Sequence, residues 1–116
     1  MDDDEGIVEQ VAGAALSIPR AWSATPPGRR LRALRRELRL SQRHLAEKSG
    51  VDQSVIGDLE RGADGRWSTW NRLFEVFGYQ AVPLPVTCSE ESEEILRLER
   101  LERKDRMTFG REARWR

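Results

Sequence analysis

The sequence predicts an all-α fold class: a compact domain of four to five helices, followed by a short β-strand and a C-terminal helix. Two observations carry the helical prediction. Apolar residues recur every three to four positions along most of the 116 residues. Residues 41–62, SQRHLAEKSGVDQSVIGDLERG, hold two such segments separated by Gly50. A glycine can close a helix in the left-handed conformation, which costs other residues about 1 kcal/mol or more. Two short helices joined in this way form a helix-turn-helix.

Residues 1–28 form an N-terminal leader in our interpretation. Ile7, Val8 and Val11 fall near one helical face behind an acidic start, which indicates a short helix over residues 5–17. A frayed leader fits the same residues equally well. The cluster Pro26-Pro27-Gly28 then predicts a linker.

Residues 29–78 are predicted to be the helix-turn-helix domain. Its first helix, residues 30–38, turns Leu31, Leu34 and Leu38 inward. Arg35 lies on the same side of this helix. A charge in that place is costly unless an acid neutralises it.

The motif itself follows. Ser41 and Asp52 stand where N-cap residues belong, because their side-chain oxygens can accept hydrogen bonds from backbone N–H groups of the first turn. Val55, Ile56 and Leu59 form the inward stripe of the second helix, residues 52–61.

A further helix is predicted between Gly62 and Gly78. Ser68 is its candidate N-cap, and four apolar residues follow at helical spacing: Trp70, Leu73, Phe74 and Phe77. Trp67 and Trp70 fit either a hydrophobic core or stacking on bases. Core packing is the commoner fate of aromatic residues at this spacing, so we favour it.

Residues 79–116 are predicted to form a strand, a charged helix and a tail. Residues 79–86, YQAVPLPV, alternate as an extended segment, and the two prolines confine it to a sheet edge. An antiparallel copy from a second chain would satisfy its backbone, so we expect a homodimer. Residues 89–106 form the helix, and residues 107–116 form either a disordered tail or a segment that folds onto a partner or onto phosphates. The residues expected at the dimer contact are Tyr79, Val82, Leu84 and Val86.

One set of residues at fixed spacing carries a family resemblance: Leu40-Ser41-Gln42, Leu45-Ala46, Gly50-Val51, Ile56 and Leu59-Glu60-Arg61-Gly62. Over residues 31–78 the chain resembles the phage-repressor-like (Xre family) helix-turn-helix, with its lambda-repressor-like fold. Paired strands like the one expected here are a feature of the HipB-like antitoxin branch of that family. The resemblance implies that Arg35 pairs with Glu60, the alternative being two independent surface charges. It also implies that Gln42 holds a phosphate oxygen.

The helix of residues 52–61 has the size that fits the major groove, where residues at the start of a helix reach base edges. Gln53 can pair with adenine, and Asp58 can accept from cytosine, although an acid near phosphates also repels them. Gly57 either permits close approach to DNA or is a tolerated exposed glycine. The residues expected to contact bases are Gln53, Ser54, Gly57 and Asp58. Those expected to contact phosphates are Gln42, Arg43, Arg61, Arg29 and Arg30.

The distribution of charge agrees with this assignment. The formal net charge of the chain is zero. Residues 29–72 nevertheless carry eleven Lys and Arg against six Asp and Glu, whereas residues 1–20 carry five acids and one arginine. The basic excess therefore falls on the segment expected to meet phosphates.

Other classes of function find little support in the sequence. A single cysteine, Cys88, and a single histidine, His44, provide neither a disulfide framework nor a metal cluster. No phosphate-binding loop and no nucleophile–base pairing stand out, so we expect no enzyme, no cofactor and no metal. No apolar run approaches the roughly 20 residues of a membrane span, and the acidic start is unlike a signal peptide. We expect a cytoplasmic protein.

Two functions remain. The first is a sequence-specific DNA-binding transcriptional regulator, a dimeric repressor that binds double-stranded DNA with residues 52–61. The alternative is an antitoxin-like protein, which binds and neutralises a toxin partner through its C-terminal segment while it regulates its own operon.

Overall fold

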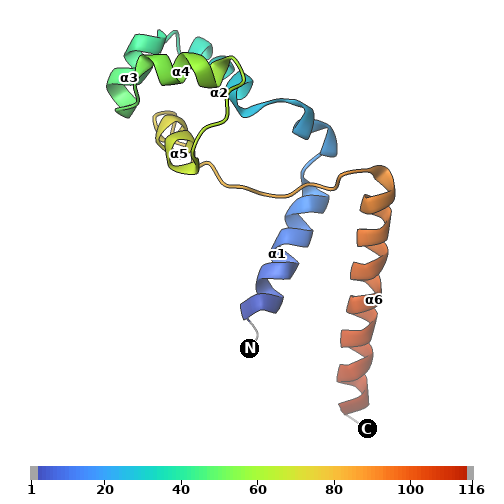
Figure 1. Ribbon diagram of the computed structural model, residues 1–116. Coiled ribbons are helices and arrows are strands. Elements are labelled where there is room, and N and C mark those ends of the chain that lie inside the picture. Colours follow the sequence, from blue (N-terminus) through green and yellow to red (C-terminus); the bar gives the residue numbers. More distant parts are fainter. Residues whose placement is uncertain (1–2, 115–116) are drawn as a thin grey trace. The chain divides into compact units, whose positions relative to one another are not determined.

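The computed structural model describes residues 3–114, with side chains for residues 4–105. These residues form six α-helices and one 3-10 helix, and none of them forms a strand (Figure 1). The prediction of a helical protein is confirmed. The chain divides into two compact units, which we call the central unit, Ser23–Pro83, and the terminal unit, the described residues on either side of it.

Four helices make up the central unit: α2 (Pro27–Glu37), α3 (Gln42–Ser49), α4 (Gln53–Glu60) and α5 (Trp67–Glu75). Helix α4 packs against α2 and α3, and α5 packs against α3. Each helix contributes one side chain with no exposed surface: Leu31, Leu45, Ile56 and Leu73. Burying one such side chain stabilises a fold by about 1.5–3 kcal/mol, so this shared core fixes the four helices against one another.

The turn between α3 and α4 follows from local chemistry. The Ser41 side chain accepts a hydrogen bond from the His44 backbone N–H at 3.0 Å and so begins α3. Gly50 ends α3 in the left-handed conformation with φ 76°. Asp52 stands at the N-cap position of α4, as predicted, but its side chain makes no capping hydrogen bond.

Helix α2 differs from its prediction at both ends. It begins at Pro27, because proline is tolerated at the first helical position, so the cluster interpreted as a linker is the start of the helix. A Cβ on the buried Gly28 would lie 1.9 Å from the carbonyl oxygen of Leu59, and the glycine therefore lets α2 approach the end of α4. At the other end Leu38 is 59% exposed rather than inward, because α2 stops at Glu37 and Arg39 reverses the chain with φ 56°.

The short β-strand predicted over residues 79–86 is not formed, and this prediction is wrong. Pro83 and Pro85 have no N–H groups for a ladder. The N–H of Ala81 donates instead to the Asn71 side chain at 3.1 Å, and Ala81 packs against the core. The alternation that resembled a strand thus belongs to an extended coil.

The two tryptophans at the start of α5 differ in burial. Trp70 joins the core and stacks on Phe74, with ring centroids 6.1 Å apart. Trp67 is 46% exposed, because α5 begins at Trp67 itself, one residue before the predicted cap Ser68. The favoured core interpretation therefore holds for Trp70 and not for Trp67.

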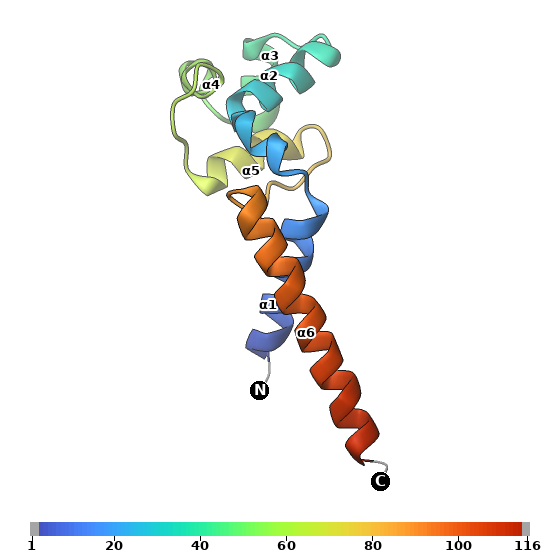
Figure 2. The ribbon, with the colours of Figure 1, turned by 90° about the vertical axis from the view of Figure 1, so that its right-hand side faces the viewer.

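The terminal unit contains α1 (Asp3–Ser17) and α6 (Glu90–Arg114), and the 3-10 helix Arg20–Ala24 spans the chain boundary between the two units. Figures 1 and 2 both show α1 and α6 side by side. The Glu9 carboxylate accepts from Arg100 at 3.0 Å and from Arg103 at 3.1 Å. Of the two interpretations of the leader, a docked helix is therefore the one observed.

Helix α6 continues past the predicted end at residue 106. Its backbone is helical to Arg114, where a tail was predicted. Trp115 of that tail lies outside the described residues, as do the side chains from residue 106 onward.

Candidate nucleic-acid interface

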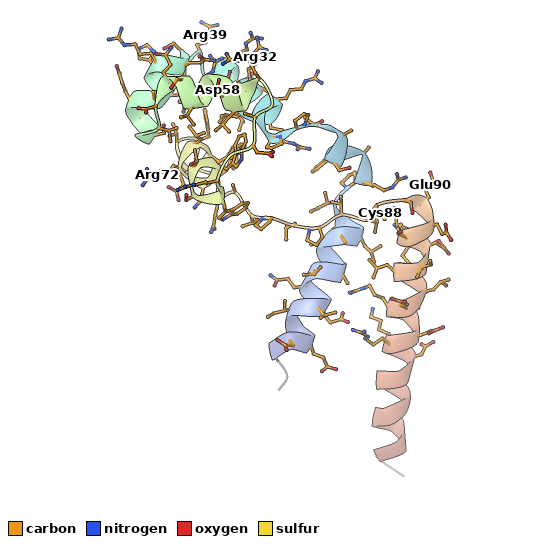
Figure 3. The ribbon with its side chains drawn as sticks, viewed as in Figure 1. Arg32, Arg39, Asp58, Arg72, Cys88 and Glu90 are labelled. Atoms are coloured by element: carbon orange, nitrogen blue, oxygen red, sulfur yellow. The ribbon has the colours of Figure 1, made fainter. Side chains whose placement is uncertain are left out.

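The outward face of α4 carries a compact set of polar side chains. Ile56 and Leu59 point into the core. Gln53, Ser54 and Asp58 are exposed, and Figure 3 labels Asp58 on the helix. Val55, predicted to be inward, is 38% exposed because it lies at the edge of the buried stripe. Three of the four residues expected to contact bases are therefore open to solvent on one rigid helix.

Gly57, the fourth, is buried. A Cβ at this position would lie 3.3 Å from Nη1 of Arg61 and 3.6 Å from Oε1 of Gln42. These two side chains are the nearest neighbours of that position. The missing side chain of Gly57 therefore leaves room for the side chains of Arg61 and Gln42.

Arg61 follows α4, and its side chain turns back along the helix. Nη2 of Arg61 lies 2.5 Å from Oδ1 of Asp58, three residues earlier. Both side chains remain largely exposed. An isolated exposed pair of this kind contributes about 0.2–1 kcal/mol to stability, so its main effect here is to position the Arg61 guanidinium.

Arg35 and Glu60 are in direct contact behind this face. Nε of Arg35 donates to Oε2 of Glu60 at 2.8 Å, and Nη2 donates to Oε1 at 2.9 Å. Only 12% of the Arg35 side chain and 3% of the Glu60 side chain are exposed. Arg35 also donates to the Leu40 carbonyl at 2.9 Å, and Gln42 donates to Oε1 of Glu60 at 3.3 Å. The pair thus joins α2, the start of α3 and the end of α4.

These contacts shift the pKa of both groups. Burial by itself raises the pKa of the Glu60 carboxyl, but hydrogen bonds from Arg35 and Gln42, with the charges of Arg35 and Arg32, lower it below its ordinary value. The hydrogen bond to Glu60 raises the pKa of the Arg35 guanidinium, against the opposing effect of its own burial. Both groups are therefore held in their charged forms.

Four of the five residues expected at phosphates lie near two helix starts, the exception being Arg61 at the end of α4. Gln42 is the first residue of α3 and is half-buried, while Arg43 beside it is 80% exposed in its side chain and pairs with Glu47 at 3.6 Å. Arg29 and Arg30 are exposed in the first turn of α2. A helix start carries the positive end of the helix dipole, which favours an anion.

Two contacts at this interface had no clear signal in the sequence. The bond from Gln42 to Glu60 and the return of Arg61 over Gly57 depend on side-chain rotamers of residues from different helices. The start of α2 did carry a signal, because proline is favoured at the first helical position, which Pro27 occupies.

The described residues hold no group of three or more His, Cys, Asp or Glu side chains placed to bind a metal ion. None of their helices is long and apolar enough to cross a membrane.

Comparison with known proteins identifies the central unit. A family model described as a helix-turn-helix domain matches residues 28–85, which is half of the chain. The curated proteins and the solved structures gave no match.

Proposed function

The chain belongs to the helix-turn-helix domain family, and on this premise we propose that it is a sequence-specific DNA-binding transcriptional regulator of the phage-repressor-like type. The observation that carries the proposal is the outward face of α4. Polar Gln53 and Ser54 stand at its start, and buried Ile56 holds the helix in place. A helix so fixed can enter the major groove with its first residues at the base edges.

The proposed contacts divide by role. Gln53 donates to and accepts from adenine, and Ser54 adds a weaker contact to the neighbouring base. Gln42 and Arg43 at the start of α3 hold phosphate oxygens, which set the register of α4 in the groove. Arg29 and Arg30 at the start of α2 add further phosphate contacts. The basic excess of residues 29–72 supports this division.

We further propose that the regulator is a homodimer and acts as a repressor. Three apolar side chains of the segment that follows α5 are exposed: Tyr79 by 57%, Val82 by 52% and Leu84 by 43%. Because the segment forms no strand, the support for this contact comes from those side chains and no longer from unpaired backbone groups. Dimerisation doubles the length of DNA that is read, and a repressor then occludes the site it covers.

A second candidate function is supported by the terminal unit. Helices α1 and α6 form a groove of about 580 Å³, lined mainly by apolar residues that include Ile7, Val11, Val86 and Ile95. Exposed apolar surface of this kind marks contact with another protein. An antitoxin-like role, in which a toxin partner covers this groove while the central unit binds the operon, is compatible with the first proposal.

The regulator proposal is tested by binding of the full-length chain to a randomised duplex library at two salt concentrations. The expected result is enrichment of one short motif, with affinity that falls as salt rises. A variant with Gln53→Ala and Ser54→Ala provides the control, because it removes base contacts and keeps every phosphate contact. Equal binding of all duplexes by the unchanged protein, or no binding, contradicts the proposal.

The antitoxin alternative calls for a different experiment. The chain is co-expressed with the product of the neighbouring gene, and growth is followed. An antitoxin restores growth that the neighbouring product arrests, and Val11→Lys with Ile95→Lys should abolish that rescue while DNA binding is kept. Absence of growth arrest, or rescue that survives both substitutions, argues against this role for the groove.

A further inference from the structure

The contact between Asp58 and Arg61 points to roles for both residues that differ from those the sequence suggested. We propose that Arg61 reads a guanine in the major groove, that Asp58 holds its guanidinium in position, and that Gly57 provides the space in which the guanidinium lies. This inference rests on the proposed function and deepens it, because it names a base that α4 recognises.

The position of the guanidinium is the first argument. Arg61 comes after the last turn of α4, where an extended side chain would leave the helix. Its Nη2 instead lies 2.5 Å from Oδ1 of Asp58, and its Nη1 lies 3.3 Å from the point that a Cβ of residue 57 would occupy. The guanidinium is thus drawn back over the outward side of α4, beside the residues expected to meet bases.

The second argument is the cover over Gly57. The Gln42 amide oxygen lies 3.6 Å from the same Cβ position, and the nitrogen of that amide is held by Glu60 at 3.3 Å. Gly57 is buried, and both this amide and the guanidinium lie close to it. A methyl group here would be favourable for the helix, but it would displace the guanidinium by a few tenths of an ångström. The glycine and the position of Arg61 therefore belong together.

The third argument is chemical. A guanidinium carries five N–H donors in a planar fork, and Asp58 engages one edge of it. The remaining donors can pair with O6 and N7 of guanine, which is the commonest specific contact of arginine with DNA. A guanidinium oriented before binding loses less side-chain entropy when the contact forms. The pairing also neutralises Asp58, whose charge alone would repel the phosphates.

The test compares the full-length chain with Arg61→Lys and Asp58→Asn in the randomised duplex library. Lysine keeps the charge and lacks the fork. Both variants should lose preference for guanine at the same position of each half-site, by about 5- to 150-fold, the range for one bidentate base contact. The double variant should lose no more than Arg61→Lys alone, because the two residues act through one contact.

Gly57→Ala supplies an independent readout. The added methyl should raise the Tm by about 4–8 °C, because alanine is the better helix residue. It should at the same time reduce the guanine preference, since the guanidinium must move. A rise in Tm with an unchanged preference would show that Gly57 has no part in recognition, and it would overturn this step.

A matched control is another exposed arginine–acid pair of the central unit, Arg43 with Glu47. Glu47→Gln breaks that pair and should leave the preference at every position unchanged. If Arg61→Lys and Asp58→Asn alter different positions, or none, while the unchanged protein keeps its motif, the inference fails and the proposed function stands. If the unchanged protein has no motif, both fail.

Discussion

At the scale of single residues, Glu60 explains how three helices meet at one point behind the reading face. It lies at the end of α4 and accepts hydrogen bonds from Arg35 of α2 and from Gln42 of α3. Its side chain is only 3% exposed, so its charge depends on these donors rather than on water. Any change at Glu60 or Arg35 should therefore be felt by the whole motif.

Arg35→Ala should cost about 3–5 kcal/mol of unfolding free energy, the range for leaving one buried charge unpaired, against about 0.5 kcal/mol for a surface pair. Denaturant unfolding of Arg35→Ala, Glu60→Gln and the double variant measures the coupling between the two residues. The same cycle on the exposed pair of Arg43 and Glu47 serves as the control. A coupling energy near zero for Arg35 and Glu60 would contradict this prediction.

The lowered pKa of Glu60 also predicts how stability depends on pH. In acid the unfolded chain binds a proton at this carboxyl before the folded chain does, so unfolding takes up protons. The stabilisation is complete above the ordinary pKa of 4.5 and is lost as the pH falls through the lower pKa of the folded state. Denaturant midpoints measured from neutral to acid pH should fall less steeply below 4.5 for Glu60→Gln than for the unchanged protein. If the denaturant midpoints of the two proteins fell equally steeply below pH 4.5, this prediction would be wrong.

Residues at the interface should separate into two classes of effect. Gln53→Ala should cost about 1–3 kcal/mol at the preferred site and blur the preference at one base pair of each half-site. Gln42→Ala and Arg43→Ala should weaken binding to all sequences alike, and loss of Arg43 should reduce the salt slope by about one. Library binding at several salt concentrations measures both effects. An unchanged sequence preference in Gln53→Ala would show that α4 presents another face to DNA.

At the scale of elements, the chain shows which boundaries its sequence can predict. The ends of α3 depend on Ser41 and Gly50, whose capping and left-handed conformations are local, and both were predicted. The start of α2 at Pro27 also has a local signal, whereas the close approach of Gly28 to Leu59 joins residues far apart in the sequence and was missed. The absence of the strand predicted over residues 79–86 has a similar reason, because it depends on the hydrogen bond from the Ala81 N–H to the Asn71 side chain.

The candidate site shows the same division. Periodicity was enough to place Gln53, Ser54 and Asp58 on the outward face of α4. The burial of Gly57 could not be predicted, because it follows from the direction of the Arg61 side chain and from the Gln42 amide on another helix. Periodicity gives the face of a helix, whereas the contacts across that face come from the packed structure.

The close approach of α2 to α4 can be tested at Gly28. Gly28→Ala should destabilise the central unit by about 1–3 kcal/mol, because its methyl group meets the backbone of Leu59, which cannot move aside as a flexible side chain can. Gly57→Ala in the same unit is the matched control and should stabilise it by about 1 kcal/mol. Thermal unfolding of the two variants should give Tm shifts of opposite sign, and shifts of equal sign would contradict the assigned contact.

At the scale of the whole molecule, the two units differ in how much apolar surface they bury. The central unit encloses a side chain from every helix, whereas Ala15 and Thr87 are the buried residues among those described in the terminal unit. Ile7, Ile95 and Leu98 stay about half exposed there. Two helices cannot enclose both of their apolar stripes, so the terminal unit and the exposed segment before it are the parts of the chain suited to association.

The last prediction concerns that association and its consequence for DNA. The protein should be a dimer at roughly tens of micromolar, a concentration that reveals contacts of modest affinity, and Val82→Lys with Leu84→Lys should make it monomeric. Gln80→Lys is the control, because it adds the same charge to the same exposed segment through a polar side chain. Sedimentation measures the mass of each protein.

The dimer should select two inverted half-sites whose centres lie about 34 Å apart, one turn of DNA, or a multiple of that distance. The monomeric variant should select a single half-site with the same bases, since α4 is untouched. A wild-type monomer would exclude the dimer, and a dimer that survives both lysines would move the contact to the exposed apolar residues of α1 and α6.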